Sequence, residues 1–206
     1  MAEWFRNESW DDKIEALFEA KLKRSRDKPQ YLKIQAIHLS KHIEFLGVSE
    51  KLLNRYFIDF PEDRFNRSSC FEILGDIYWS KDNLEKAIYY YKQAVDFEAI
   101  YPKVLTQAYL KLSELVVKTA SADMYTMIEN LILVRVERTL FPVEKYKGYS
   151  ILSIINSYKN EIEKSRYYAD LAEQNANEKT SGLRYHKELG VVKERDNLLD
   201  MLVRKI

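Results

Sequence analysis

The sequence is poor in cysteine, glycine and proline, and each shortage excludes a class of structure. With Cys70 as the single cysteine among 206 residues, no disulfide can form within the chain and no cysteine cluster can bind zinc. Five glycines and four prolines indicate a nearly all-helical chain with short turns. No stretch approaches the roughly 18 apolar residues of a membrane helix. The first residues also lack the regions of a secretory signal. We therefore expect a cytoplasmic protein with no membrane partner.

An excess of charge and recognisable catalytic motifs are also missing. The 33 basic and 32 acidic residues leave a net charge of +1, which disfavours nucleic acid as the partner. The sequence has no G-x-S-x-G, P-loop or G-x-G-x-x-G motif, so we expect neither an enzyme nor a cofactor. His38 and His42 are spaced i, i+4 but lack further ligands and the H-E-x-x-H pattern, so we predict no metal site. Cys70, beside an apolar Phe71, is interpreted as a small semi-buried residue rather than a reactive thiol.

Helical periodicity is clearest between Ser68 and Ala94. Two amphipathic segments lie on either side of the polar break Lys81–Asn83, with apolar residues three, four and seven apart. Gly75 and Ala87 are small where two helices would cross closely. This pattern predicts a helical hairpin, which cannot bury its apolar face without neighbours of the same kind. The positions that carry the pattern are Phe71, Leu74, Gly75, Tyr78, Ala87, Tyr91 and Ala94.

These seven positions resemble the tetratricopeptide repeat (TPR), whose consensus has aromatic, Leu-Gly, Tyr and Ala residues at the same spacing. The family's closing proline would fall at Ala99, whereas Pro102 comes three residues later. The resemblance implies an α-solenoid that binds proteins.

A second copy of the hairpin lies downstream, at Tyr149–Ala172, and aligns with Phe71–Ala94 without a gap. Nine of the 24 aligned positions are identical. Ser153 replaces Gly75 and Ser165 replaces Ala87, so the crossing positions remain small. The shift between the copies is about two repeat lengths, which leaves room for one further unit between them.

The four prolines, Pro29, Pro61, Pro102 and Pro142, recur at intervals of about one repeat. Because proline suits the first turn of a helix, we expect each one to open a hairpin. The chain is thus predicted to be one all-α domain, 1–206, a right-handed TPR-like α-solenoid with an N-terminal helix and C-terminal capping helices. The hairpins are expected near 30–60, 62–101, 103–141 and 143–180, followed by a cap at 181–206.

Further helix limits follow from capping residues and periodicity. Asp11 or Ser9 is expected to cap a helix from about 10 to 27. Gly47 is expected to end a helix from 30, and Ser49 to cap the next one, from 50 to 59. In the cap, we predict helices Leu183–Leu189 and Val191–Lys205 around Gly190. The helix predicted from about 10 to 27 ends in basic residues: Lys21, Lys23, Arg24, Arg26 and Lys28. They form either a solvated helix end or a docking patch for an acidic partner.

The resemblance also implies a partner-binding groove lined by the first helix of each hairpin. When the groove positions of the family are aligned on Gly75, the lining residues are Ser69, Glu72, Asp76, Trp79 and Ser80. When the same positions are aligned on Ser153, the lining residues are Lys147, Ser150, Ile154, Ser157 and Tyr158.

Glu72 and Asp76 would favour a basic or amide-rich ligand and repel a peptide's terminal carboxylate. Trp79 is expected either to anchor a partner or to pack against the next hairpin.

We therefore expect a non-catalytic module that binds a protein partner through its groove or an end face, as a cytoplasmic adaptor or regulator. A dedicated inhibitor, such as a bacterial immunity protein that neutralises a toxin, is the first alternative. An RNA-binding helical repeat is the second, and it would require a basic groove. The sequence leaves the oligomeric state open.

Overall fold

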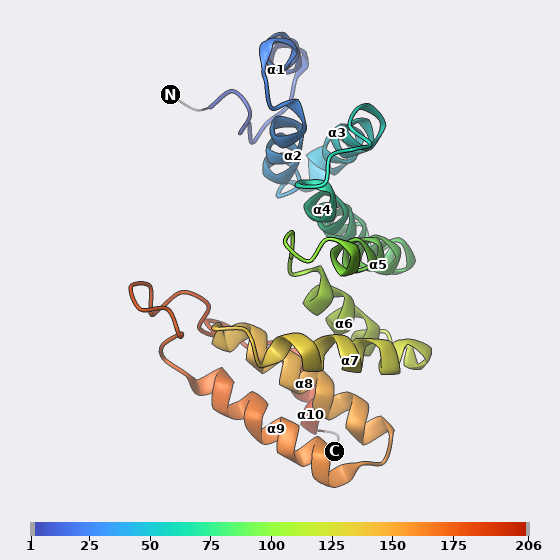
Figure 1. Cartoon of the computed structure of the whole chain (residues 1–206), viewed down its shortest axis with the longest axis vertical. Coiled ribbons are helices and arrows are strands. Elements are labelled where there is room, and N and C mark those ends of the chain that lie inside the picture. Colours follow the sequence, from blue (N-terminus) through green and yellow to red (C-terminus); the bar gives the residue numbers. More distant parts are fainter. Residues whose placement is uncertain (1–2, 205–206) are drawn as a thin grey trace. The chain divides into compact units, whose positions relative to one another are not determined.

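The computed structural model describes residues 3–204, and every regular element in that range is a helix (Figure 1). The predicted all-α class is therefore confirmed, and adjacent helices pack against one another as a helical repeat requires. The chain forms two compact units, Met1–Ala108 and Tyr109–Ile206. None of the helices within residues 3–204 is both long and apolar enough to cross a membrane.

The first unit is built from five α-helices and a short 3-10 helix. Asp11, one of the two predicted caps, starts α1, because its carboxylate accepts the backbone N–H groups of Lys13 and Ile14 at 2.9 and 2.8 Å. Pro29 lies in the first turn of α2, also as predicted. The bounds of these elements are α1 Asp12–Arg24, α2 Lys28–Leu39, η1 Ile43–Phe45, α3 Leu46–Asp59, α4 Arg67–Ser80 and α5 Leu84–Ile100.

The second unit continues the pattern of paired helices. Pro142 is the first residue of α8, as predicted, but Pro61 and Pro102 lie in the loops before α4 and α6 and begin no helix. The strongest pairing in this unit is between α8 and α9. Its elements are α6 Ala108–Lys118, η2 Ala122–Met124, α7 Tyr125–Val136, α8 Pro142–Tyr158, α9 Ile162–Asn177 and α10 Asn197–Arg204.

The turn between α2 and α3 differs from the prediction. The first helix of this pair ends at Leu39, and Gly47 lies inside α3 rather than at the end of a helix. Ser49 is not a helix cap either, since its buried hydroxyl donates to the backbone carbonyl of Ala36 at 2.8 Å. The hydroxyl thus joins α3 to α2, a long-range role that helix-capping rules do not reveal.

Three later hairpins share one turn geometry. Asp82, Ala120 and Asn160 have φ angles of 56°, 52° and 60°, in the left-handed region. In each case the next residue donates its N–H to a carbonyl five residues back, as in a Schellman motif. Asp82 and Asn160 occupy equivalent positions in the two sequence copies, so the copies end their first helices in the same way.

The two sequence copies also share a polar contact with the preceding helix. In the first unit, Glu50 of α3 accepts hydrogen bonds from Tyr78 and Lys81. In the second unit, Glu129 of α7 accepts them from Asn156 and Lys159. Burial alone would raise the pKa of Glu50, but the hydrogen bonds from Lys81 and Tyr78 outweigh it and the pKa is lowered. The matching lysines of the two copies therefore hold neighbouring hairpins together.

The small residues at the helix crossings have the role that the sequence predicted. A β-carbon on Gly75 would lie 2.4 Å from the Tyr91 ring, so α4 and α5 can pack this way only around glycine. In the second copy, Ser153 donates to the backbone carbonyl of Ser165 at 2.9 Å, and Ser165 donates to that of Ser153 at 2.8 Å. The same close crossing is thus formed sterically in one copy and by hydrogen bonds in the other.

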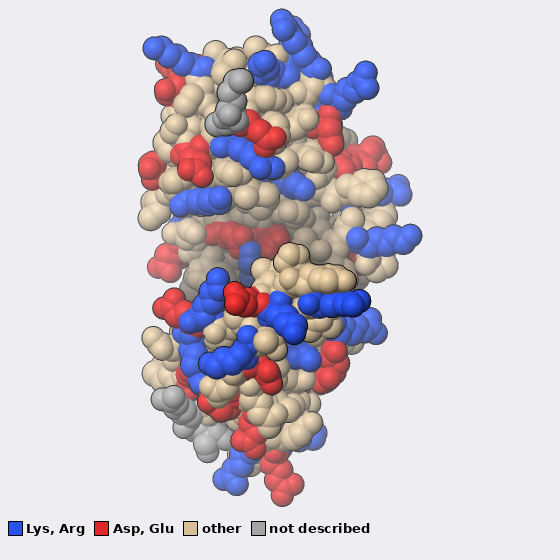
Figure 2. Space-filling model, turned by 90° about the vertical axis from the view of Figure 1, so that its left-hand side faces the viewer, with Lys and Arg blue, Asp and Glu red and all other residues tan. Residues whose placement is uncertain are grey.

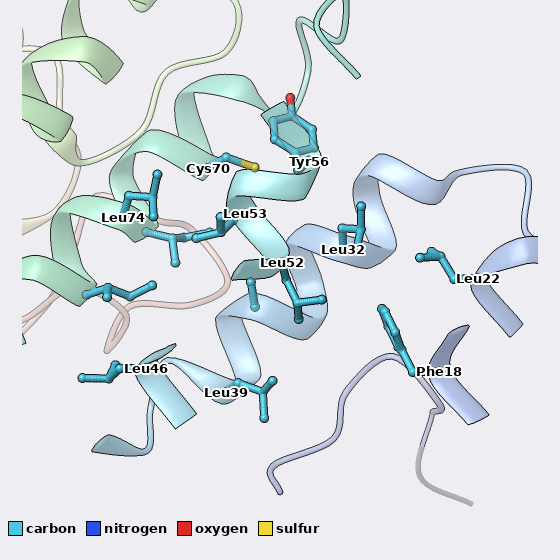
Figure 3. Packing of buried hydrophobic residues seen from close by; sticks show 13 residues of the cluster. Phe18, Leu22, Leu32, Leu39, Leu46, Leu52, Leu53, Tyr56, Cys70 and Leu74 are labelled. Carbon is cyan, nitrogen blue, oxygen red and sulfur yellow. The ribbon is translucent and has the colours of Figure 1, made fainter. Parts of the chain in front are cut away.

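The core of the first unit lies along the seams between α1, α2, α3 and α4. Figure 3 shows α3, with Leu52 and Leu53, between the leucines of α2 and Leu74 of α4, and Leu53 is fully buried. Cys70 points into this core beside Tyr56 and is also fully buried. Burial raises the pKa of the Cys70 thiol, so the side chain is an inert core residue rather than a reactive one.

The tail after α9 is the largest departure from the predicted helices. Leu183–Leu189 is not helical, and the last helix begins only at Asn197, while the end predicted at Lys205 lies outside the described residues. The tail instead pairs with the α7–α8 loop and the first turn of α8: Gly182 donates to the Leu140 carbonyl at 3.0 Å, and Val143 of α8 donates to the Gly190 carbonyl at 2.8 Å. Gly190 has a φ of +77°, which favours glycine.

Candidate partner-binding site

The groove residues predicted from Gly75 lie along α4 in the first unit. Ser80 is exposed, and the other four are partly buried. Their spacing places them on one side of the helix. The set is Ser69, Glu72, Asp76, Trp79 and Ser80.

Tyr91 of α5 holds two members of this row in place. Its hydroxyl donates to the Asp76 carboxylate at 2.7 Å. The Trp79 ring meets the Tyr91 ring edge to face, with centroids 6.1 Å apart and planes at 78°. Trp79 therefore packs against the second helix of its own hairpin, a contact that neither sequence interpretation named.

The groove residues predicted from Ser153 lie on α8 in the second unit. Tyr158 is 64% exposed and packs edge to face on Tyr125, with centroids 5.1 Å apart. Ile154 and Ser157 are partly exposed. Ser150 differs from the expectation, because only 1% of its surface is exposed. Ser150 lies instead beside Val203 of the C-terminal helix, where both line a small cavity of about 60 Å³.

The C-terminal helix α10 rests on α8, as Figure 1 also shows. We call the surface beneath it the α10 seat and define it as Tyr146 and Ser150 of α8 together with Ala169, Ala172 and Glu173 of α9. On the α10 side, Leu199 is fully buried, whereas the neighbouring Leu198 and Met201 remain 39% and 46% exposed. The helix thus buries one stripe and leaves apolar side chains outside.

Two carboxylates one turn apart fix the polar edge of α10. Asp196 caps the helix by accepting the N–H groups of Leu198 and Leu199, and it also accepts a hydrogen bond from Lys118 of α6 at 2.6 Å. Asp200 accepts a hydrogen bond from the Tyr146 hydroxyl at 2.8 Å. The seat and its surroundings therefore present donors to the acidic side of the helix.

An arginine just before α10 links the tail to α9. Arg195 donates to both oxygens of Glu173, at 3.0 and 2.6 Å, and to Asp200 at 2.7 Å. Burial alone would raise the pKa of Asp196, yet the Lys118 ammonium and the Leu199 N–H lower it overall. The Asp196 carboxylate is therefore charged at neutral pH, when it can pair with Lys118.

The two histidines lie outside any cluster of potential metal ligands in the described part of the chain. Nδ1 of His38 and Nε2 of His42 are buried without a hydrogen-bond partner. Residues 3–204 contain no group of three or more potential ligand side chains around a common point. Burial, with the nearby Lys41 and Arg6, lowers the pKa of His38, so this ring is held in its neutral form.

The basic end of α1 borders an open hollow of about 380 Å³ whose lining includes Lys23, Lys28 and Arg55. Arg55 is already paired with Glu19 at 2.6 Å and with Asp59 at 3.1 Å. On the face drawn in Figure 2, basic and acidic side chains are interspersed within each unit. The docking patch for an acidic partner stays a prediction.

An exposed apolar surface lies where α5 ends. Phe65 and Ile100 are 85% and 70% exposed, and they line a hollow of about 300 Å³ with Arg64 and Tyr101. The Arg64 guanidinium lies 5.1 Å from the centroid of the Tyr101 ring. These residues were not among those predicted from the sequence, although Phe65 follows the polar segment Glu62–Arg64 and thus stands out as an apolar residue in a loop.

Comparison of the chain with models of protein families, with curated proteins and with solved structures found no match. The α10 seat was not predicted from the sequence. C-terminal capping helices were predicted, but no docking surface was assigned to them. The signal that was present is the pair Asp196 and Asp200 flanking Leu199, which predicts a helix with one acidic and one apolar side.

Proposed function

We propose that this chain is a non-catalytic helical-repeat protein, of the TPR-like solenoid type, that binds another protein. The observation that carries the proposal is the docking of α10, since α8 and α9 already hold a short amphipathic helix in the way that a helical partner would be held. The docked helix covers Ser150, one of the residues that the TPR resemblance assigns to partner binding.

Two further features support the repeat architecture on which this function depends. The left-handed turns at Asp82 and Asn160 recur at equivalent positions of the two sequence copies. The contacts of Glu50 and Glu129 with the following hairpin recur as well. Repeats of this kind stack into an extended surface suited to peptides and helices.

The proposal is tested by site-specific photocrosslinking in extracts of the cells that make the protein. A photoreactive amino acid is placed at Ser157, on the predicted binding side of α8, and at Arg166, an exposed residue of α9, as the matched control. We expect a discrete protein adduct from position 157 and none from position 166. One stoichiometric adduct would favour a dedicated inhibitor, and several would favour an adaptor.

Adducts from position 166 alone would contradict the assignment of the binding side. The absence of adducts at both positions, and at a third probe at Tyr158, would contradict protein binding by this unit. Each substituted chain is first checked by circular dichroism, so that a misfolded variant is not counted as a negative result.

A further inference from the structure

We propose that the α10 seat is a binding site for an acidic amphipathic helix of a partner protein, and that α10 occupies it as a competing intramolecular latch. The inference rests on the proposed function and specifies both the partner's chemistry and the regulation of its binding. The evidence is the chemistry of the contacts around the seat, the burial of Leu199 and the shortness of the present occupant.

The contacts of α10 define what the seat accepts. A partner helix needs a leucine-like side chain in the place of Leu199, which is fully buried. It also needs carboxylates one turn apart in the places of Asp196 and Asp200, because Lys118 and the Tyr146 hydroxyl donate to those positions at 2.6 and 2.8 Å. A basic helix would deprive the Tyr146 hydroxyl of the Asp200 carboxylate and Lys118 of its Asp196 partner, leaving the Lys118 bond to Glu114 in place, so two charge-assisted bonds would be lost.

The present occupant of the seat is a short helix. The helix α10 spans eight residues, Asn197–Arg204, and isolated helices shorter than about 12 residues are marginal in water. Its tether, from Glu178 to Asp196, contains no helix and is fixed by hydrogen bonds from Gly182 to the α7–α8 loop and from the first turn of α8 to Gly190. The helix is therefore ordered by docking, and a partner helix with more contacts can replace it without unfolding α8 or α9.

Tethering determines how strong a competitor must be. Because the tether is held at Gly190, a short stretch of chain joins α10 to its anchor, and a segment joined so closely competes at an effective concentration on the order of millimolar. A free peptide with the chemistry of α10 is thus expected to bind the intact chain weakly. It should bind much more tightly once the latch is weakened, since the apparent affinity is reduced by the fraction of molecules whose seat is closed.

The test uses the full chain and a fluorescein-labelled peptide with the sequence of residues Arg195–Val203. Leu199→Ser weakens the latch, and Leu198→Ser is the matched control because Leu198 is 39% exposed and its neighbour is fully buried. We expect the peptide to bind the Leu199→Ser chain at least tenfold more tightly than the wild type or the Leu198→Ser chain. Exchange of both aspartates in the peptide for lysine should abolish binding.

A second variant covers the case in which Leu199→Ser disturbs the fold. Asp200→Asn keeps the apolar contact but weakens the bonds from Tyr146 and Arg195, and it should increase peptide affinity severalfold. Equal affinity for all four chains, or undiminished binding of the lysine peptide, would overturn the proposal. A dimer formed by the Leu199→Ser chain in light scattering would also overturn it, because the occupant would then be α10 of a second copy.

The two proposals can fail separately. Peptide binding without any photocrosslink at positions 157 and 158 would leave the acidic-helix site in place and contradict the proposed cellular function. Photocrosslinks without peptide binding would do the reverse.

Discussion

Replacing Gly75 with serine is expected to destabilise the first unit, because the ring of Tyr91 fills the space that a β-carbon needs. A β-carbon at Gly75 would lie 2.4 Å from two ring carbons and 2.9 Å from a third. Tyr91 is fully buried and its hydroxyl is bonded to Asp76 at 2.7 Å, so the ring cannot turn aside without losing that bond. Overpacking of this kind costs about 1–3 kcal/mol. The gain from removing a glycine inside a helix is only about 0.5 kcal/mol.

The second sequence copy supplies the compensating change. Ser153 occupies the place of Gly75 there, and Ala169 occupies the place of Tyr91. Tyr91→Ala alone should cost about 3–5 kcal/mol through the cavity that it leaves. In that background Gly75→Ser should be neutral or slightly stabilising. The double-mutant cycle is therefore expected to show a favourable coupling of about 1–3 kcal/mol between the two changes.

Urea unfolding followed by tryptophan fluorescence measures this coupling in the first unit specifically. The three tryptophans, Trp4, Trp10 and Trp79, all belong to it. Circular dichroism in the far ultraviolet serves as the probe of both units, and the slope of each transition is compared to check that the unfolded state is unchanged. An equal cost of Gly75→Ser in both backgrounds would refute the steric explanation.

Three further predictions concern surface, pH and the tail. Phe65→Ser should change the free energy of unfolding by no more than about 0.5 kcal/mol, because Phe65 is 85% exposed, whereas Leu53→Ala at a fully buried site should cost about 2–5 kcal/mol in the same urea assay. Because the pKa of His38 is lowered in the folded chain, the unfolded chain takes up the proton at a higher pH than the folded chain does. Stability should therefore be complete above pH 6.5 and decline as the pH falls through the folded pKa. The variant His38→Gln should reduce that decline in urea midpoints measured from neutral to mildly acidic pH. The lowered pKa of Asp196 means that its ionised carboxylate stabilises the folded chain above pH 3.8, the usual pKa of an aspartate, and that this stability is lost as the pH falls through the folded pKa. Burial alone would lower the pKa of Lys118, but the hydrogen bonds to Asp196 and Glu114 together raise it. This ion pairing contributes stability that is complete below pH 10.5 and is lost at higher pH. Hydrogen exchange of α10 should therefore show constant protection near neutrality and loss in acid, and constant protection in acid as well would contradict the ion pair.

Much of the local structure was predictable because it depends on residues close together in the sequence. The period of Phe71, Leu74 and Tyr78 places these side chains on one side of a helix whatever the helix packs against. Asp11 caps α1 through neighbouring N–H groups, so its role was visible from the sequence. Prolines were less reliable, since Pro61 and Pro102 occupy loops and proline tolerates a loop as well as a first helical turn.

The candidate site was only partly predictable because its decisive contacts join distant segments. Tyr146 and Asp200 are 54 residues apart, and Lys118 and Asp196 are 78 residues apart. The predicted row on α8 contained Ser150, but nothing local indicated that α10 would cover it. Similarly, the pattern around Trp79 did not show that Tyr91 would hold it from the next helix.

The sequence by itself determined the all-α class, the helical hairpins and the need for small residues at Gly75 and Ser153. These features follow from periodicity and side-chain size, which act over one or two helical turns. Only the tertiary structure decided that the segment from Glu178 to Asp196 is not helical and that α10 docks on α8. The physical reason is that the tail satisfies backbone groups on the α7–α8 loop and the first turn of α8, and that α10 docks on α8, all of them residues far from the tail in the sequence.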